Sequence, residues 1–150
     1  KGKVKYIRSL KKIDNSSAFL RRNIHRIEKG LITNARPKSK IILGLDYEAD
    51  KFDIGLYNTL FGKVTITSPI GEEFDQDLKS KLATDLSLKY KFTDKLSLTA
   101  IINNIFDVYP DPTLASTGTA QAATRFTYSS EVQQLGQLGT NFSIGLNYQF

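Results

Sequence analysis

The sequence contains no cysteine and a single histidine, His25, among its 150 residues. Disulfide bonds and cysteine-ligated metal sites are therefore excluded, and so is a zinc site made only of histidines from this chain. No run of about 18 apolar residues occurs, which excludes a transmembrane helix. Transmembrane strands are not covered by this argument, because they need only about 10 residues, of which every second one is apolar.

Charge is unevenly distributed along the chain. Residues 1–40 contain 13 Lys and Arg against 2 Asp and Glu, whereas the remainder contains 8 against 13. The formal net charge of +6 is therefore a local feature and does not describe a uniformly basic surface. The chain starts with KGKVKY, without Met and without the segments of a secretion signal, so we expect an N-terminal part to be missing.

Five stretches alternate apolar and polar residues with a period of two, which predicts strands with one apolar face. These stretches are residues 40–48, 52–66, 81–92, 96–104 and 141–150. The short joins ADK and TDK predict tight hairpin turns. Long joins at 9–37, 67–80 and 107–140 alternate with them. The prediction is an all-β, antiparallel up-and-down meander, with short turns at one rim and long loops at the other, as in outer-membrane barrels.

The first long join contains a helical pattern in SSAFLRRNIHRIEKGL, residues 16–31. Its apolar residues recur at spacings of four, three and four: Leu20, Ile24, Ile27 and Leu31. This pattern predicts a short helix, and Gly30 is its expected C-terminal stop.

Aromatic residues gather on the apolar face at the strand ends nearest the short turns. The set is Tyr47, Phe52, Tyr90, Phe92, Tyr148 and Phe150. They lie at one height if the last strand runs parallel to the strand that ends at Phe92, as in an aromatic girdle at a membrane interface. The alternative is a soluble β-domain with core aromatics, which need not collect at one rim. The opposite face, rich in Gly, Asn, Ser, Asp and Lys, suits a hydrated lumen.

The number of strands is too small for a complete transmembrane barrel. We predict five strands and a fragment of a sixth, whereas the smallest such barrels have about 8. Open edges would leave backbone groups unpaired, which lipid does not permit. We therefore expect the chain to be the last part of a larger barrel, with the missing strands N-terminal and the true C-terminus at Phe150.

The segment NNIFDVYP closely resembles a motif near the C-terminus of TonB-dependent outer-membrane receptors. The matching residues are Asn103, Asn104, Ile105, Phe106, Asp107, Tyr109 and Pro110. RPKSKIILGLDYE, LFGKVT, LKSKLATDLSLKYKFTDKLSLT and the terminal strand are also similar to the family, so the resemblance spans essentially the whole chain. Two departures are small, since Ile105 replaces the usual Leu and Asn104 adds a second Asn.

The resemblance implies a barrel of about 22 strands, of which this chain would supply the last five or six. It implies a receptor in the outer membrane of a Gram-negative bacterium that imports a large scarce nutrient, such as a ferric siderophore, haem or cobalamin. The inner-membrane proton gradient would drive this transport through the TonB complex, which acts on a plug in the missing N-terminal region. The long joins would face the exterior. Phe150 resembles the signal that the barrel-assembly machinery recognises.

The polar residues of this motif have a structural interpretation. Asn103, Asn104 and Asp107 lie where a strand ends, and their side chains can form hydrogen bonds to nearby backbone and fix the exit of the chain. No catalytic constellation occurs, so we expect no enzyme and no cofactor. An acidic loop offers oxygen ligands to Ca²⁺: Glu72, Glu73, Asp75 and Asp77. Its spacing matches no EF-hand, and a solvated loop is the favoured interpretation.

The basic N-terminal join gives the strongest binding signal. Its weak candidates for substrate contact are Arg21, Arg22, His25 and Arg26. They could hold a carboxylate of haem or of a siderophore, or face lipopolysaccharide phosphates. Nucleic acid is disfavoured, because the strands lack an interleaved pattern of basic and stacking aromatic residues. Two alternatives stay open: a soluble β-barrel or sandwich that binds a ligand, and a non-transport outer-membrane barrel such as an adhesin.

Overall fold

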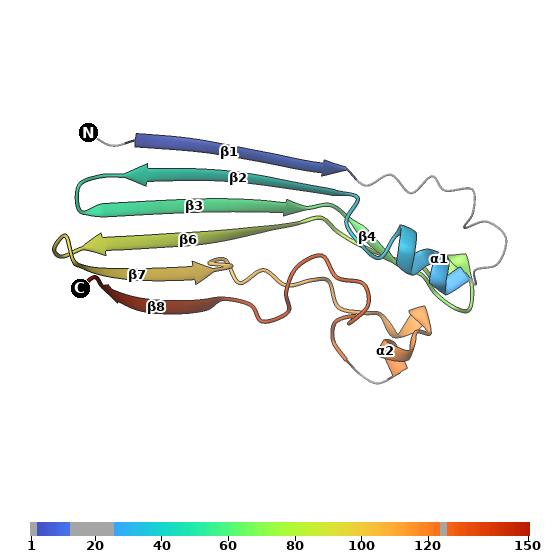
Figure 1. Ribbon diagram of the computed structural model, residues 1–150. Helices are drawn as coiled ribbons and strands as arrows, with labels where there is room; N and C mark the ends of the chain where they lie inside the picture. Colours follow the sequence, from blue (N-terminus) through green and yellow to red (C-terminus); the bar gives the residue numbers. More distant parts are fainter. Residues whose placement is uncertain (1–2, 13–25, 124–125) are drawn as a thin grey trace.

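A six-stranded antiparallel sheet dominates the computed structural model, with its strands in the order β1-β2-β3-β6-β7-β8 (Figure 1). The structure describes residues 3–12, 26–123 and 126–150. For residues 3–12 and 120–121 it describes the backbone only. The strands are β1 (Lys3–Lys12), β2 (Ser39–Glu48), β3 (Phe52–Phe61), β6 (Lys81–Lys91), β7 (Leu96–Asn103) and β8 (Asn141–Tyr148). The predicted antiparallel meander is confirmed, and the sheet within these residues is open, with β1 and β8 at its edges.

The first strand is longer than the sequence predicted. We expected only a fragment of a sixth strand and a long join from residue 9, but β1 continues to Lys12. It pairs with β2 from Lys3 opposite Glu48 to Lys12 opposite Ser39. The join between them is therefore shorter than expected.

The predicted strand at 52–66 is wrong in one respect, because it divides at Gly62. There β3 ends, and β4 (Val64–Ile66) leaves the large sheet and pairs with β5 (Gln76–Leu78). The backbone N–H of Gly62 donates to the carbonyl of Ser39 at 2.9 Å, so the chain stays attached to the start of β2 as it turns. A Cβ at Gly62 would crowd the Ser39 hydroxyl, which explains why a glycine lies at the bend.

The expected long loops contain short regular elements. Between residues 67 and 80 the chain forms the 3₁₀ helix η2 (Glu72–Phe74) and β5. The join from 107 to 140 contains η3 (Ala115–Thr117) and the short helix α2 (Ala120–Ala123). None of the helices within the described residues is long and apolar enough to cross a membrane.

Helix α1 spans Arg26–Thr33, and the predicted stop at Gly30 is wrong. The helix passes through this residue, whose carbonyl accepts hydrogen bonds from the backbone N–H groups of Asn34 and Ala35 at 2.8 and 3.0 Å. Gly30 is buried, and a Cβ at this position would overlap the side chain of Thr67. The glycine therefore permits close packing and does not end the helix. Leu20 and Ile24, which belong to the predicted helix, lie outside the described residues.

We expect Gly30→Ala to destabilise the protein by about 1–2 kcal/mol, although alanine has the higher helix propensity. The added methyl group must displace Thr67 or move α1 away from β4. Urea denaturation of the two proteins measures the difference. Gly145→Ala is the matched control, because a Cβ at Gly145 meets nothing within 4 Å and this change should not destabilise. Equal stability of Gly30→Ala and the parent would contradict the packing argument.

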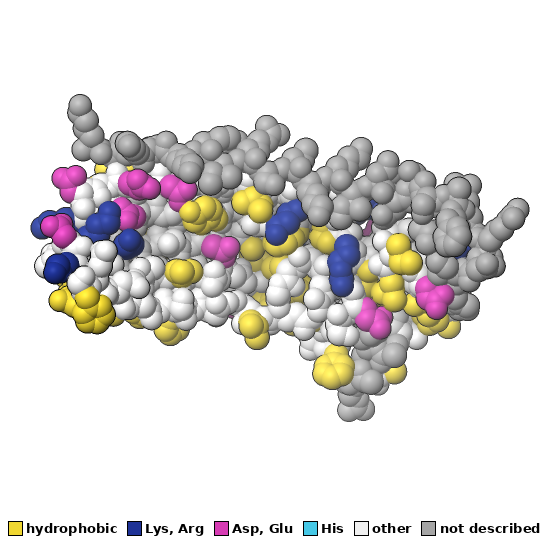
Figure 2. Space-filling model, in the orientation of Figure 1, with side chains coloured by type: hydrophobic (Ala, Val, Ile, Leu, Met, Phe, Trp, Pro, Cys, Tyr) yellow, Lys and Arg dark blue, Asp and Glu magenta, His cyan; other side chains and the backbone are white. Residues whose placement is uncertain are grey.

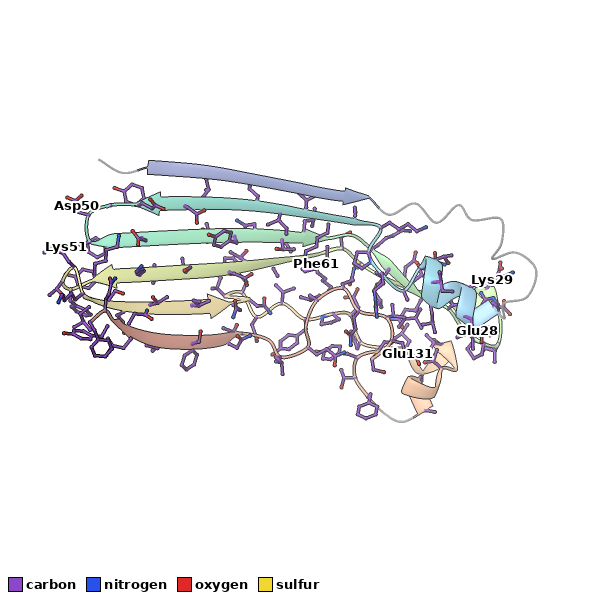
Figure 3. The ribbon with its side chains drawn as sticks, in the orientation of Figure 1. Glu28, Lys29, Asp50, Lys51, Phe61 and Glu131 are labelled. Atoms are coloured by element: carbon purple, nitrogen blue, oxygen red, sulfur yellow. The ribbon has the colours of Figure 1, made fainter. Side chains whose placement is uncertain are left out.

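The buried apolar core lies at the end of the molecule away from the short turns. It comprises Ala35, Val64, Ile66, Leu78 and Val132, with Leu31 of α1 packed against it. Figure 3 labels Glu28 and Lys29 on α1 and Glu131 nearby at this end, whereas Asp50 and Lys51 mark the turn at the other end of the sheet. We call this group of buried residues the loop-end core. Because it lies beside the sheet's far end, it covers little of the sheet itself.

Candidate membrane-facing surface

The strand register places the predicted apolar residues on one face of the sheet. Ile54 pairs with Leu88, Leu88 with Ala100, and Ala100 with Ile144. The next row continues through Leu56, Leu86, Ile102 and Phe142. Cross-strand neighbours on one face contact one another, so these rows form a continuous apolar band across four strands. We call this surface the apolar face.

The apolar face is largely uncovered in the described structure. Leu45 is 46% exposed, and on the edge strand Ile144 and Leu146 are 69% and 67% exposed. Of the described side chains on this face within the strands, only Thr84 is buried. A water-exposed apolar surface of this extent is unusual in a soluble monomer and marks a surface that meets lipid or a partner.

The six aromatic residues singled out in the sequence lie together at the turn end of this face. The ring of Tyr90 lies 5.0 Å from that of Phe52 and 4.8 Å from that of Phe92, between ring centroids. Tyr148 and Phe150 form a second pair at 5.3 Å. The two groups share one height, because the backbone N–H of Phe92 donates to Leu96, which is opposite Tyr148 in the register. Tyr47 lies beside them, next to the turn that leads to Phe52.

One polar pair interrupts the apolar face near its loop end. The hydroxyl of Thr84 donates to the side-chain oxygen of Asn58 at 2.8 Å, and the two residues are direct neighbours across β3 and β6. The carbonyl of Thr84 also accepts from the N–H of Ile105 at 2.9 Å. This bond uses the hydroxyl of Thr84 and the side-chain oxygen of Asn58, which lowers the cost of placing these two groups within an apolar surface. The sequence pattern did not reveal this contact.

The opposite face is polar and carries charged groups at its turn end (Figure 2). Lys91 forms an ion pair with Asp53 at 3.0 Å. Further along the face, the ring of Tyr57 lies against Gly44 and Gly55, where a Cβ would approach the ring to 2.8 Å, and its hydroxyl donates to Asp46. An aromatic ring over strand glycines replaces the side-chain packing that glycine lacks. Contacts between side chains of the polar face hold these groups in place, and the face is polar enough to lie against water.

Asn104 fixes the exit of the chain from β7. Its side-chain amide donates to the carbonyl of Val108 at 2.8 Å and accepts from the N–H of Val108 at 3.0 Å. Its own N–H donates to Asp85 at 2.8 Å. The backbone of Asn104 adopts a positive φ of 53°, a left-handed conformation that asparagine tolerates better than most residues. The expected hydrogen bonds of this motif to nearby backbone are therefore present.

Asp107 extends the same turn to the start of β8. It also has a positive φ, of 54°, and its carboxylate accepts from the N–H of Thr140 at 2.9 Å. The hydroxyl of Thr140 donates to the carbonyl of Asn104 at 2.6 Å. The hydroxyl of Tyr109 donates to Asp107, which raises the pKa of the tyrosine above its usual value. These contacts join the two ends of the loop at 107–140.

The basic candidates for substrate contact are only partly described. Arg21, Arg22 and His25 lie outside the described residues. Arg26 is engaged within the protein, because its guanidinium binds both carboxylate oxygens of Asp75 at 2.8 and 2.9 Å and donates to the carbonyl of Ser68. Both contacts to Asp75 come from one guanidinium nitrogen, Nη2, and this ion pair attaches α1 to the loop before β5. Arg26 in this state is a structural residue.

The acidic loop is likewise engaged in internal contacts. Asp75 also accepts from the N–H of Ser68 at 2.7 Å, and Asp77 accepts from the hydroxyl of Thr65 at 2.6 Å. The bond from Thr65 lowers the pKa of Asp77, and the charge of Lys63 acts in the same direction, whereas burial opposes them. Across the described parts of the chain, no group of three or more His, Asp or Glu side chains is arranged to hold a metal ion.

Sequence reasoning missed the polar side chains that bind the loops to the strands. The amide of Gln134 donates to the carbonyls of Gly62 and Lys79 at 2.7 and 2.8 Å. Gln76 bonds to two backbone groups of the join at 107–140 in the same way. Asp111 accepts from the N–H of Lys79 at 2.7 Å and from the ammonium of Lys81 at 2.6 Å. Only the folded arrangement identifies these residues, since Gln and Asp are ordinary in loops.

The pKa of Asp111 predicts a pH-dependent loop contact. Burial raises the pKa of Asp111. The hydrogen bonds from Lys81 and Lys79 and the charges of both lysines lower it by more than burial raises it, so the pKa lies below its usual value. A carboxyl whose pKa is depressed by folding contributes stability above its unfolded pKa of about 3.9 and loses it as the pH falls through the folded value. We expect the Lys79 amide resonance to shift in that acidic range and to stay constant in Asp111→Asn. Identical titration curves for the two proteins would contradict this assignment.

Similarity to known proteins gives no further guide to the family of this chain. No protein-family model, no curated protein and no solved structure matches it.

Proposed function

We propose that this chain is a segment of a β-barrel in the outer membrane of a Gram-negative bacterium, and that the apolar face meets lipid. The observation that supports the proposal most strongly is the uncovered apolar face, bounded at one end by the six aromatic residues. Strands β2, β3 and β6 are 10, 10 and 11 residues long. These lengths match the 9–11 residues that a tilted strand needs to cross the hydrocarbon layer, about 30 Å thick.

Lipid explains the distribution of side chains better than a second protein layer does. The core of a sandwich gives aromatic residues no reason to collect at one rim, whereas here they gather at the turn end of the face. Membrane barrels place Tyr and Phe at the interface between hydrocarbon and water. The charged groups, including the pair of Lys91 and Asp53, lie on the other face, where a hydrated lumen would solvate them. The two open edges, β1 and β8, would pair with further strands of the barrel.

We further propose that the barrel is a TonB-dependent receptor of about 22 strands that imports a large scarce nutrient, such as a ferric siderophore, haem or cobalamin. The support is the resemblance of NNIFDVYP and its neighbouring segments to that family. In this role the strands and outer loops form the wall and rim of the transport path and perform no chemistry. The partners would be outer-membrane lipid, lipopolysaccharide, the barrel-assembly machinery and the TonB complex, the last through a region outside this chain.

The membrane assignment predicts how the intact protein behaves on cell fractionation. Because the apolar face requires an apolar environment, we expect the protein to stay in the outer-membrane pellet after a high-pH wash and to be released by detergent. Immunoblots of each fraction measure this. Recovery in aqueous buffer without detergent would contradict the lipid contact and favour a soluble β-domain.

Transport is tested separately by growth. A strain that lacks the gene should fail to grow when one iron compound, haem or cobalamin is the sole source of that nutrient. The same defect should appear when TonB is removed, because the proposed uptake depends on the proton gradient. Normal growth on every source, combined with membrane location, would contradict the transport proposal and favour a barrel with another role, such as adhesion.

A further inference from the structure

A pocket lies where the start of β2 meets β4, at the loop end of the molecule. Its volume is about 220 Å³, and its lining residues are Asn34, Lys38, Ser39, Lys63, Val64 and Thr65. Two lysines, an asparagine, a serine and a threonine therefore border one small space. The segments RPKSKIILGLDYE and LFGKVT supply most of this set, but the sequence pattern did not show that they meet.

The walls of the pocket are fixed by backbone hydrogen bonds. The N–H of Thr65 donates to the carbonyl of Asn34 at 3.0 Å, and the N–H of Gly62 donates to the carbonyl of Ser39 at 2.9 Å. These bonds hold residues 34–39, which lead into β2, against residues 62–65, which lead into β4. A binding site whose walls are already in place loses less conformational entropy when a ligand binds.

The charge in the pocket is only weakly compensated. Lys38 has no ion pair with any residue of the described structure. Lys63 lies 3.4 Å from Asp77, but both side chains are mostly exposed, and Asp77 receives its shorter hydrogen bond from Thr65. Exposed pairs of this kind contribute little stability, so an anion can compete for Lys63.

The donors match a tetrahedral anion. Lysine ammonium groups bind phosphate as point charges with several donors, and a hydroxyl and an amide can donate to the remaining oxygens. The Ser39 hydroxyl makes no hydrogen bond within the described residues, so it is free to donate. A phosphate monoester carries nearly two negative charges at neutral pH. It therefore matches the charge of two lysines better than a carboxylate ligand, which carries one. We propose that this pocket binds a phosphate group, either of a soluble phosphorylated compound or of a lipid headgroup.

Binding should be measured on the whole chain in neutral detergent micelles, or in buffer if the protein proves soluble without detergent. Inorganic phosphate is the first probe, and micelles that contain phosphatidic acid are the second. The backbone amide resonances of Ser39 and Lys63 report occupancy. We expect Lys38→Gln combined with Lys63→Gln to weaken binding by about tenfold or more, because two charge-assisted contacts are lost.

Lys95→Gln is the matched control, since it removes one positive charge at the opposite end of the sheet. It should change the affinity by less than about twofold, as expected for a distant, screened charge. Saturation with inorganic phosphate alone identifies a soluble ligand, whereas saturation only with phosphatidic acid identifies a headgroup. Equal affinity of the double variant and the control would overturn the proposal, and so would the absence of binding in both arms. These outcomes do not depend on whether the protein transports a nutrient.

Discussion

Leu88→Arg should lower the free energy of unfolding of the bilayer-inserted protein by about 2–4 kcal/mol. Leu88 lies within the apolar face, opposite Ile54 on one side and Ala100 on the other. In lipid, the guanidinium would have to leave water or distort the bilayer to stay hydrated. Urea titration of the protein, folded into phosphatidylcholine vesicles and followed by tyrosine fluorescence, measures the change.

Ser87→Arg is the matched control, because Ser87 is the next residue of β6 and lies on the polar face. Its substitution should change stability by less than about 0.5 kcal/mol, as for an ordinary solvated surface position. The two proposed environments predict opposite results for Leu88. If water covers the apolar face, Leu88→Arg should be nearly neutral in stability and should raise solubility. That result would contradict the lipid contact even if Ser87→Arg behaved as expected.

Asn104→Ala should destabilise the protein by about 2–4 kcal/mol. The change removes both side-chain hydrogen bonds to Val108 and leaves the N–H and the carbonyl of this half-buried residue without these partners. It also places a residue that disfavours positive φ in a left-handed conformation. Chemical denaturation gives the total loss, and amide exchange at Val108 locates it to the turn.

Two further variants separate the causes at this turn. Asn104→Gly removes the same hydrogen bonds but tolerates the positive φ, so it should cost about 1 kcal/mol less than Asn104→Ala. Asn103→Ala loses only an exposed contact to Asn141 and should cost less than about 1 kcal/mol. Equal effects of the changes at 103 and 104 would show that the turn does not depend on the asparagine geometry described here.

The sheet was the part most accessible from the sequence, and the reason is physical. A shift of one residue in register would move every apolar side chain of a strand to the other face, so the period-two pattern predicts both the strand and the face on which each residue lies. That is why Phe52 and Tyr90 could be assigned to the same face, at the turn end of their strands, from the sequence. The break at Gly62 was not expected, because the alternation continues through LFGKVTI although the hydrogen-bond partner changes. Gly30 was assigned to a helix end because the sequence does not show that Thr67 packs against it.

The polar contacts of the loop end could not be predicted in the same way. The partners of Gln134 and Asp111 are separated from them by 30 residues or more, and no local pattern links them. Arg26 was expected to be available to a ligand because basic loop residues usually are, but Asp75 is close enough to bind it. A contact between two loops depends on where the ends of the strands lie in space, and these positions are known only from the fold.

The separation of the loop-end core from the apolar face has a consequence for how the protein unfolds. The loop-end core is stabilised by burial of its own side chains away from water, whereas the sheet would depend on the medium that covers its apolar face. A change of detergent or lipid should therefore alter the melting of the sheet and leave that of the loop end nearly constant. We therefore expect two unfolding transitions with different sensitivities in place of a single cooperative one, so that the loop-end core keeps its fold under conditions in which the sheet does not.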